Sequence, residues 1–140
     1  MKEPFTSYER RLTGLVRVPL NACLQHSLIG LEKETLRVSP AGTIASTPHP
    51  AALGSALTHP YITTDFSEAL LEAVTPAMVD RRGVLGFLRD LHVFVYRHLG
   101  DELLWATSMP CVLEGARRIP LARYGTSNAA QMKTAYRRGD

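Results

Sequence analysis

The sequence predicts a single domain of the α+β class, and two segments carry that prediction. Residues 29–38 predict a strand, which the turn-forming residues 39–42 join to a short extended return over 43–47. Residues 80–99 carry apolar side chains at three- and four-residue spacing, which predicts an amphipathic helix that packs on a sheet. With 140 residues the chain is long enough to bury one core.

Helix-capping residues and prolines predict the elements that precede and follow the first strand. Residues 5–28 are expected to be helical, with Ser7 as a cap and an interruption at Pro19. After the hairpin, Pro50 favours the start of a short helix over 51–57.

Residues 65–74 leave two possibilities open. Their helix-forming side chains favour a short helix by propensity, whereas the alternation along 68–74 gives one mixed face of a strand. Pro76 ends either element.

The rest of the chain is one clear helix, an irregular region and a second helix. Asp80 is the expected N-cap and Gly100 the expected C-cap of the long helix. Ser127 or Asn128 can cap a helix over 129–138. In the irregular region 101–123, four side chains are expected to pack inward: Trp105, Met109, Pro110 and Cys111.

Acidic side chains carry the candidate chemistry. Glu32 and Glu34 lie two residues apart in the first strand, so their carboxylates share one face and repel unless a positive charge lies between them. Asp65 and Glu72 lie amid apolar neighbours in a second segment. Four such carboxylates could surround Mg²⁺, which prefers oxygen ligands. The alternative is that both strand glutamates lie on the solvated face of an edge strand. Glu68 is expected to be a solvated charge rather than a ligand.

Composition and motifs exclude several other classes. A net charge of +3, dispersed basic residues and few aromatics argue against nucleic acid as a partner. No apolar run is long enough for a membrane span, and two isolated cysteines favour a reducing, cytoplasmic location. Neither a P-loop nor a GxGxxG motif occurs, and the histidines lack zinc-site spacing.

Five motifs in one order resemble a known family. They are GLEKETLRV (30–38), LGSALTHPYITTDFSEALLE (53–72), LRDLH (88–92), SMPC (108–111) and YGTSN (124–128), followed by Met132–Lys133 and Tyr136–Arg137. Together they closely resemble the N-terminal part of bacterial glutamate–cysteine ligase, over about residues 27–139.

The resemblance implies an enzyme of glutathione biosynthesis that uses Mg²⁺ and takes ATP as co-substrate. ATP would phosphorylate the side-chain carboxylate of glutamate, and the amine of cysteine would attack the γ-glutamyl phosphate. The implied fold is similar to glutamine synthetase, with an antiparallel sheet curved into a funnel, of which this chain would form part. In that fold the segment 67–75 is extended.

The resemblance also assigns residues to the site. It implies Glu32, Glu34, Asp65 and Glu72 as magnesium ligands. It places Tyr136 in the cysteine pocket and Arg137 near the phosphates, as a catalytic residue.

Family enzymes are several times longer than this chain. Residues 1–140 are therefore expected to be the N-terminal portion of one catalytic domain, with the missing C-terminal part as a possible partner. The alternative is a truncated, non-catalytic relic or a half that binds magnesium without turnover. The isolated chain is expected to be inactive.

Overall fold

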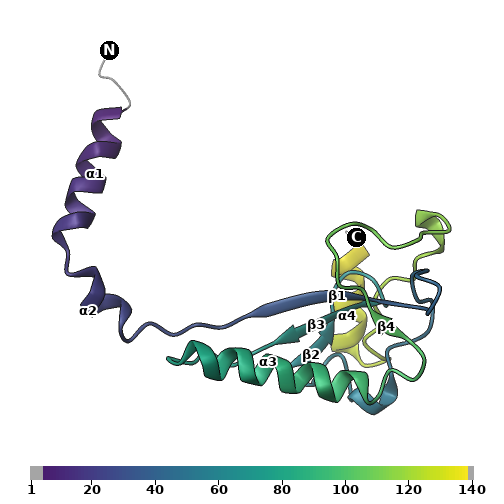
Figure 1. The fold of residues 1–140 in the computed structure, drawn as a ribbon. Helices are drawn as coiled ribbons and strands as arrows, with labels where there is room; N and C mark the ends of the chain where they lie inside the picture. The colour runs from purple at the N-terminus through teal and green to yellow at the C-terminus, as the bar shows by residue number, and fades with distance from the viewer. Residues whose placement is uncertain (1–4, 139–140) are drawn as a thin grey trace.

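A four-stranded antiparallel sheet forms the centre of the fold in the computed structural model, which describes residues 5–138 (Figure 1). The strand order is β2-β3-β1-β4, so β1 and β3 are the inner strands. The strands are β1 (Glu32–Val38), β2 (Ile62–Thr64), β3 (Leu70–Val74) and β4 (Leu103–Leu104). Helices and antiparallel strands occupy separate stretches of the chain, and the predicted α+β class is confirmed.

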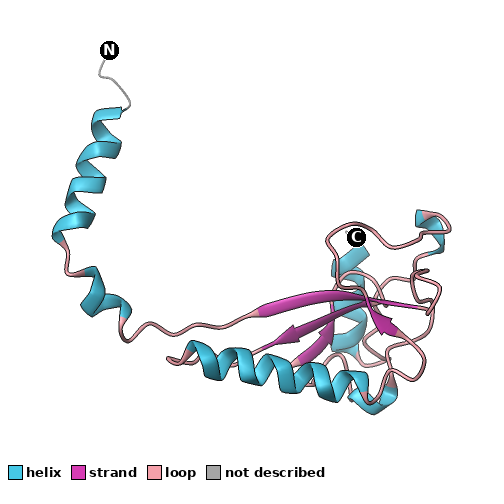
Figure 2. Ribbon diagram, viewed as in Figure 1, coloured by secondary structure: helices cyan, strands magenta, loops and turns pink. Residues whose placement is uncertain are grey.

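Four α-helices and two short 3₁₀ helices complete the described fold. Figure 2 draws helices in cyan and strands in magenta. They are α1 (Phe5–Arg17), α2 (Leu20–Leu24), η1 (Ala51–Leu53), α3 (Arg81–Tyr96), η2 (Ala116–Arg118) and α4 (Asn128–Arg138). Figure 1 shows α1 and α2 apart from the sheet. No helix among the described residues is both long and apolar enough to cross a bilayer.

Helix α3 packs along one face of the sheet and forms the main core with it. Asp80 caps the helix as predicted, because its carboxylate oxygens accept the backbone N–H groups of Arg82 and Gly83, each at 3.0 Å. The predicted apolar stripe of α3 supplies Leu91 and Val95 to this core. The other buried members are Leu53, Ile62, Leu71, Ala73 and Leu99, with Phe87, Leu88, Tyr61 and Leu104 packed against them.

The segment with two possible secondary structures is a strand. Strand β3 pairs with β1 on one side and β2 on the other, so its backbone groups are satisfied by two neighbours rather than by a helical ladder. The implied extended conformation of 67–75 is therefore confirmed over Leu70–Val74.

The predicted hairpin is only partly present. The turn is confirmed: Gly42 has φ of 79° and donates its N–H to Ser39 O at 2.9 Å. The return over 43–47 is not a strand, because it forms only isolated bridges, Val38–Ile44 and Thr43–Val112. The ladder partners of β1 are β3 and β4 instead.

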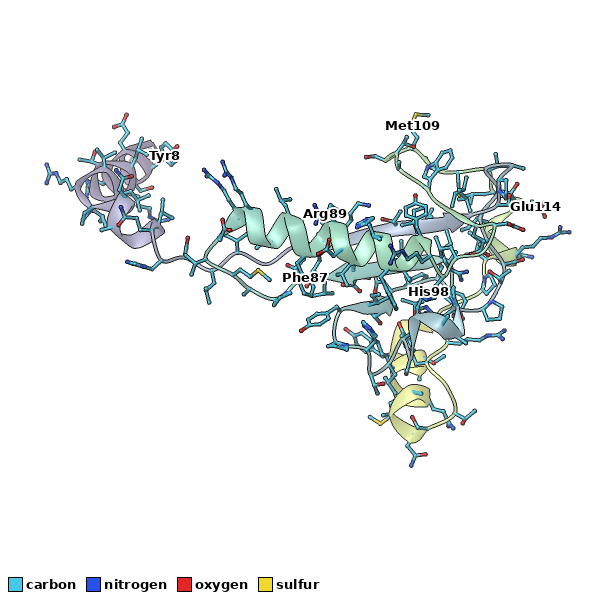
Figure 3. All side chains as sticks on the ribbon, turned by 60° about the horizontal axis from the view of Figure 1, so that its bottom comes forward. Tyr8, Phe87, Arg89, His98, Met109 and Glu114 are labelled. Atoms are coloured by element: carbon cyan, nitrogen blue, oxygen red, sulfur yellow. The ribbon has the colours of Figure 1, made fainter. Side chains whose placement is uncertain are left out.

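Several predicted boundaries and side-chain positions were wrong. Ser7 lies inside α1 rather than capping it, because the helix already begins at Phe5. Helix α3 ends at Tyr96, three residues before the last apolar residue of the predicted stripe. Cys111 is buried as predicted, but Met109 is 75% exposed at the outer edge of its loop (Figure 3). The helix predicted over 51–57 is only one 3₁₀ turn.

Candidate functional site

The sheet face opposite α3 carries three of the four predicted carboxylates. Strand residues alternate between faces, and Lys33 and Thr35 line the α3 side together with Leu91. Glu32 and Glu34 therefore point to the other side, where both are exposed. The register places Glu34 directly opposite Glu72 of β3. The prediction that these glutamates share one face with Glu72 thus agrees with the strand pairing.

This pairing brings two like charges together across the strands. Directly opposite residues of an antiparallel pair have Cβ atoms about 5 Å apart, and like charges there are destabilising. A divalent cation would remove that repulsion, and carboxylate oxygens are the donors that Mg²⁺ prefers. The Glu34–Glu72 pair fits such an ion chemically.

Asp65 lies just past the end of β2, where its N–H donates to Leu70 O at 3.1 Å. It is therefore at the connection between β2 and β3 and is half-buried. Across residues 5–138, the structure gathers no group of three or more His, Cys, Asp or Glu side chains that could hold a metal ion. It brings together one pair, and the full set of four ligands stays a prediction.

Helix α4 carries the other two predicted site residues. Ser127 caps the helix as predicted, because its Oγ accepts the N–H of Ala130 at 3.2 Å. Tyr136 is 80% exposed on this helix. Arg137 belongs to the same helix, and its side chain lies outside the part that the structure describes.

Glu68 corrects a prediction, because it is not a solvated charge. Its side chain is buried, with 4% of the residue exposed. One carboxylate oxygen accepts the N–H of His49 at 2.8 Å and the other accepts the N–H of Arg123 at 2.6 Å. Two backbone donors from distant segments replace the water that the charge would otherwise need.

Arg37 is a second buried charge, which the sequence analysis did not single out. The residue is 0% exposed, and its guanidinium forms an ion pair with Glu102 at 2.6 Å. It also donates to the side chain and carbonyl of Thr47, at 2.8 and 2.9 Å, and to Glu68 O at 2.9 Å. The Thr47 hydroxyl in turn donates a hydrogen bond to the carboxylate of Glu102. This network joins β1 to the turn between α3 and β4, where Glu102 lies, and to two loops.

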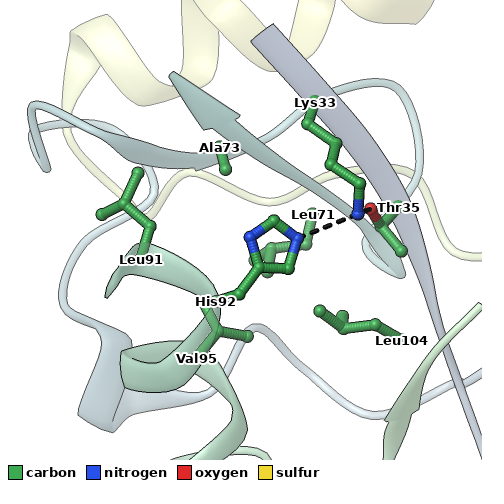
Figure 4. Close-up of a pocket in the computed structure, with 8 residues that line it drawn as sticks. All are labelled: Lys33, Thr35, Leu71, Ala73, Leu91, His92, Val95 and Leu104. Atoms are coloured by element: carbon green, nitrogen blue, oxygen red, sulfur yellow. Dashed lines mark hydrogen bonds between the residues drawn. The ribbon is translucent and has the colours of Figure 1, made fainter. Parts of the chain in front are cut away.

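A small cavity lies between α3 and β1, where His92 meets Lys33 (Figure 4). The Nδ1 atom of His92 is 2.8 Å from Leu88 O, so it carries the proton and donates. The Nε2 atom is then the acceptor for Lys33 Nζ at 2.9 Å. A neutral imidazole thus links the helix to the strand on the face away from the carboxylates.

The stability of the fold should depend on pH through His49. Burial and the nearby Arg37 lower the pKa of His49 below its usual 6.5, although Glu68 opposes the shift. The folded state therefore holds a neutral imidazole while the unfolded chain takes up a proton below about 6.5, so stability falls as pH falls through that value. His49→Gln should lose less stability than the parent chain between about pH 7 and about 5.5.

Urea unfolding of both chains at the two pH values measures this difference. The same substitution at the exposed His26 is the matched control. Equal pH dependence in the two histidine variants would contradict the role of His49.

Comparison with known proteins decides the family. The family model for glutamate–cysteine ligase matches residues 12–140 of the chain. This chain belongs to the glutamate–cysteine ligase family. The resemblance inferred from the five motifs is thereby confirmed.

Curated ligases of the family are similar over nearly the whole chain. The glutamate–cysteine ligases of Alcanivorax borkumensis and Azotobacter vinelandii are each 52% identical, over 131 and 132 residues respectively. Both alignments cover 94% of this chain but only 25% of the relative. The chain therefore spans about a quarter of the length of the curated ligases that it matches.

Two solved structures share the fold over most of this chain. A crystal structure of glutamate–cysteine ligase from Francisella tularensis in complex with AMP is 40% identical, with a TM-score of 0.77, and the match covers 81% of this chain and 23% of that one. A bifunctional glutathione synthetase from Pasteurella multocida is 39% identical, with a TM-score of 0.69, covering 74% and 14%. Over the matched residues, this chain thus has the same fold as these two structures.

Proposed function

We propose that this chain supplies part of the active site of an ATP-dependent glutamate–cysteine ligase. ATP phosphorylates the γ-carboxylate of glutamate. The nitrogen of cysteine then attacks the acyl carbon, the C–N bond forms, and the C–O bond to phosphate breaks. The observation that carries the proposal is the cross-strand carboxylate pair, Glu34 and Glu72, in a chain of this family. AMP in the ligase from Francisella tularensis supports an adenine nucleotide as ligand.

The carboxylates of the sheet have one role in this proposal. Glu34 and Glu72 hold Mg²⁺, with Glu32 and Asp65 as the further ligands. When bound, Mg²⁺ supplies positive charge that stabilises phosphoryl transfer. The sheet keeps the Glu34–Glu72 pair in place because both residues lie in its inner strands.

Helix α4 has the second role. Tyr136, exposed on α4, contributes to the pocket for the cysteine substrate, and Arg137 binds the phosphate groups. The acyl phosphate must be kept from water until the amine attacks. The remaining three quarters of a family enzyme would supply that enclosure, so the isolated chain is expected to show no turnover. The two isolated cysteines support a reducing, cytoplasmic location.

A chimera tests the proposal. The 131 aligned residues of this chain replace the matching segment of the ligase from Alcanivorax borkumensis. The chimera is expected to release phosphate only when ATP, glutamate and cysteine are all present. A folded chimera without phosphate release would contradict the proposal and favour a segment that binds magnesium without turnover.

A further inference from the structure

Glu68 joins three separate parts of the chain through hydrogen bonds to the backbone. Its two carboxylate oxygens accept N–H groups of His49 and Arg123, which are 19 and 55 residues away. Its own N–H donates to Pro120 O at 2.8 Å, and its carbonyl accepts from Arg37. A carboxylate suits this position because each of its two oxygens receives one of the two donors.

The backbone around Glu68 also pairs directly with the segment that leads into α4. Ser67 forms a bridge with Leu121, and Ala122 donates its N–H to Phe66 O at 3.1 Å. Residues 66–68 therefore hold residues 120–123 alongside them. These residues 66–68 lie between Asp65 and β3, the strand that carries Glu72.

Tyr124 makes the next link towards α4. Its buried hydroxyl lies 2.9 Å from Thr64 O and 2.8 Å from Asp65 O. Lys133 of α4 places its ammonium 4.1 Å from the centre of the Tyr124 ring, in a cation–π contact. Ala130 of α4 is packed in the same buried cluster as Tyr124. One side chain thus touches both the Asp65 connection and α4.

We propose that Glu68 and Tyr124 are positioning residues, which fix the helix that carries Tyr136 relative to the Asp65 end of the sheet. The part of the inference that concerns catalysis rests on the proposed function. Glu68 holds the approach to α4 by two backbone hydrogen bonds. Tyr124 holds α4 itself through its hydroxyl and its ring. Neither side chain touches substrate in this proposal.

Two conservative substitutions remove these contacts selectively. Glu68→Gln replaces one acceptor oxygen by an NH₂ group, so one of the N–H groups of His49 and Arg123 loses its partner. Tyr124→Phe removes only the hydroxyl. Matched controls make the same chemical changes at exposed positions: Glu114→Gln in the loop before η2 and Tyr96→Phe at the end of α3.

Amide hydrogen exchange of the 140-residue chain tests the positioning without any assay of activity. Tyr124→Phe should speed exchange at residues 121–131 about tenfold, because a buried hydrogen bond is lost there, and Glu68→Gln should speed exchange at those residues or at His49, according to which N–H its NH₂ group faces. Exchange within the core of α3 should rise much less. Equal acceleration in α3 and in residues 121–131 would mean a uniform loss of stability, and the positioning role would be wrong.

Kinetics of the chimera tests the consequence for substrate binding. Both variants should raise the KM for cysteine at least about fivefold, because α4 carries Tyr136, whereas the two control variants should stay within about twofold of the parent. An unchanged KM for cysteine, or an equal rise in the control variants, would overturn the catalytic part of the inference. An inactive parent chimera would refute the proposed function instead, and the exchange experiment would still decide whether Glu68 and Tyr124 position α4.

Discussion

Replacing Arg37 by methionine is expected to destabilise the chain by about 3–5 kcal/mol, a large share of the roughly 5–15 kcal/mol that stabilises a typical domain. The substitution leaves the carboxylate of Glu102 without its cation in a site where that side chain is only 16% exposed. It also removes the donors to the carbonyls of Thr47 and Glu68. Methionine fills similar space but offers none of these hydrogen bonds.

Urea unfolding followed by circular dichroism measures the change. Arg89→Met is the matched control, because Arg89 pairs with Asp90 on the outer face of α3, where their side chains are 75% and 69% exposed. That surface variant should stay within about 0.5 kcal/mol of the parent chain. If Arg37→Met cost no more than Arg89→Met, the buried network would not hold β1 to the turn before β4.

A double variant separates the loss of the contacts of Arg37 from the cost of leaving the carboxylate of Glu102 unpaired. Arg37→Met combined with Glu102→Leu removes both charges, so no uncompensated carboxylate remains. Replacing a buried ion pair by apolar groups is often close to neutral. The double variant should therefore recover part of the stability that Arg37→Met loses, and the recovered part measures the cost of leaving Glu102 unpaired.

Local sequence signals predicted α3 best. Its apolar spacing and the Asp80 cap are properties of neighbouring residues, and both were confirmed. The segment 65–74 shows the limit of such signals. Its propensity allowed a helix, and what makes it a strand is its place between β1 and β2, which no local window contains.

Only part of the candidate site could be predicted from local sequence signals. Period-two alternation predicted that Glu32 and Glu34 share a face, because that depends only on their own strand. That Glu34 lies opposite Glu72 depends on the register of β1 and β3, which the motifs themselves do not fix. The link of Glu72 to those two residues came from the resemblance to the family.

The burial of Glu68 and Arg37 could not be predicted from the sequence, because it depends on residues that are far away along the chain. A charged side chain is usually exposed, so Glu68 was expected in solvent. Its partners, the backbone N–H groups of His49 and Arg123, come from loops whose positions depend on the whole fold. The ion pair between Arg37 and Glu102 likewise joins residues 65 positions apart. Buried polar networks of this kind are visible only once the tertiary contacts are known.

The carboxylate pair leads to the second large prediction, which concerns activity rather than stability. Glu34→Gln in the chimera should lower the rate of phosphate release roughly 100-fold or more, because even residues that only support metal ligands cost 10–100-fold when changed. Glu32→Gln should likewise lower turnover by orders of magnitude and leave the fold intact. Raising the Mg²⁺ concentration should restore part of the loss, because a weakened site fills at higher concentration.

The stability of Glu34→Gln should not fall with its activity. Lost activity with retained stability would identify Glu34 and Glu72 as metal ligands rather than as residues that support the sheet. Glu34 faces Glu72 across the strands, so in the 140-residue chain without added Mg²⁺ the neutral amide removes a like-charge contact. Glu34→Gln should then be as stable as the parent chain or more stable by a few tenths of a kcal/mol. Asp90→Asn, an exposed carboxylate on α3, should change neither property. Full activity in Glu34→Gln would rule out the ligand assignment, whereas lost activity together with lost stability would mean that Glu34 supports the sheet instead of the metal.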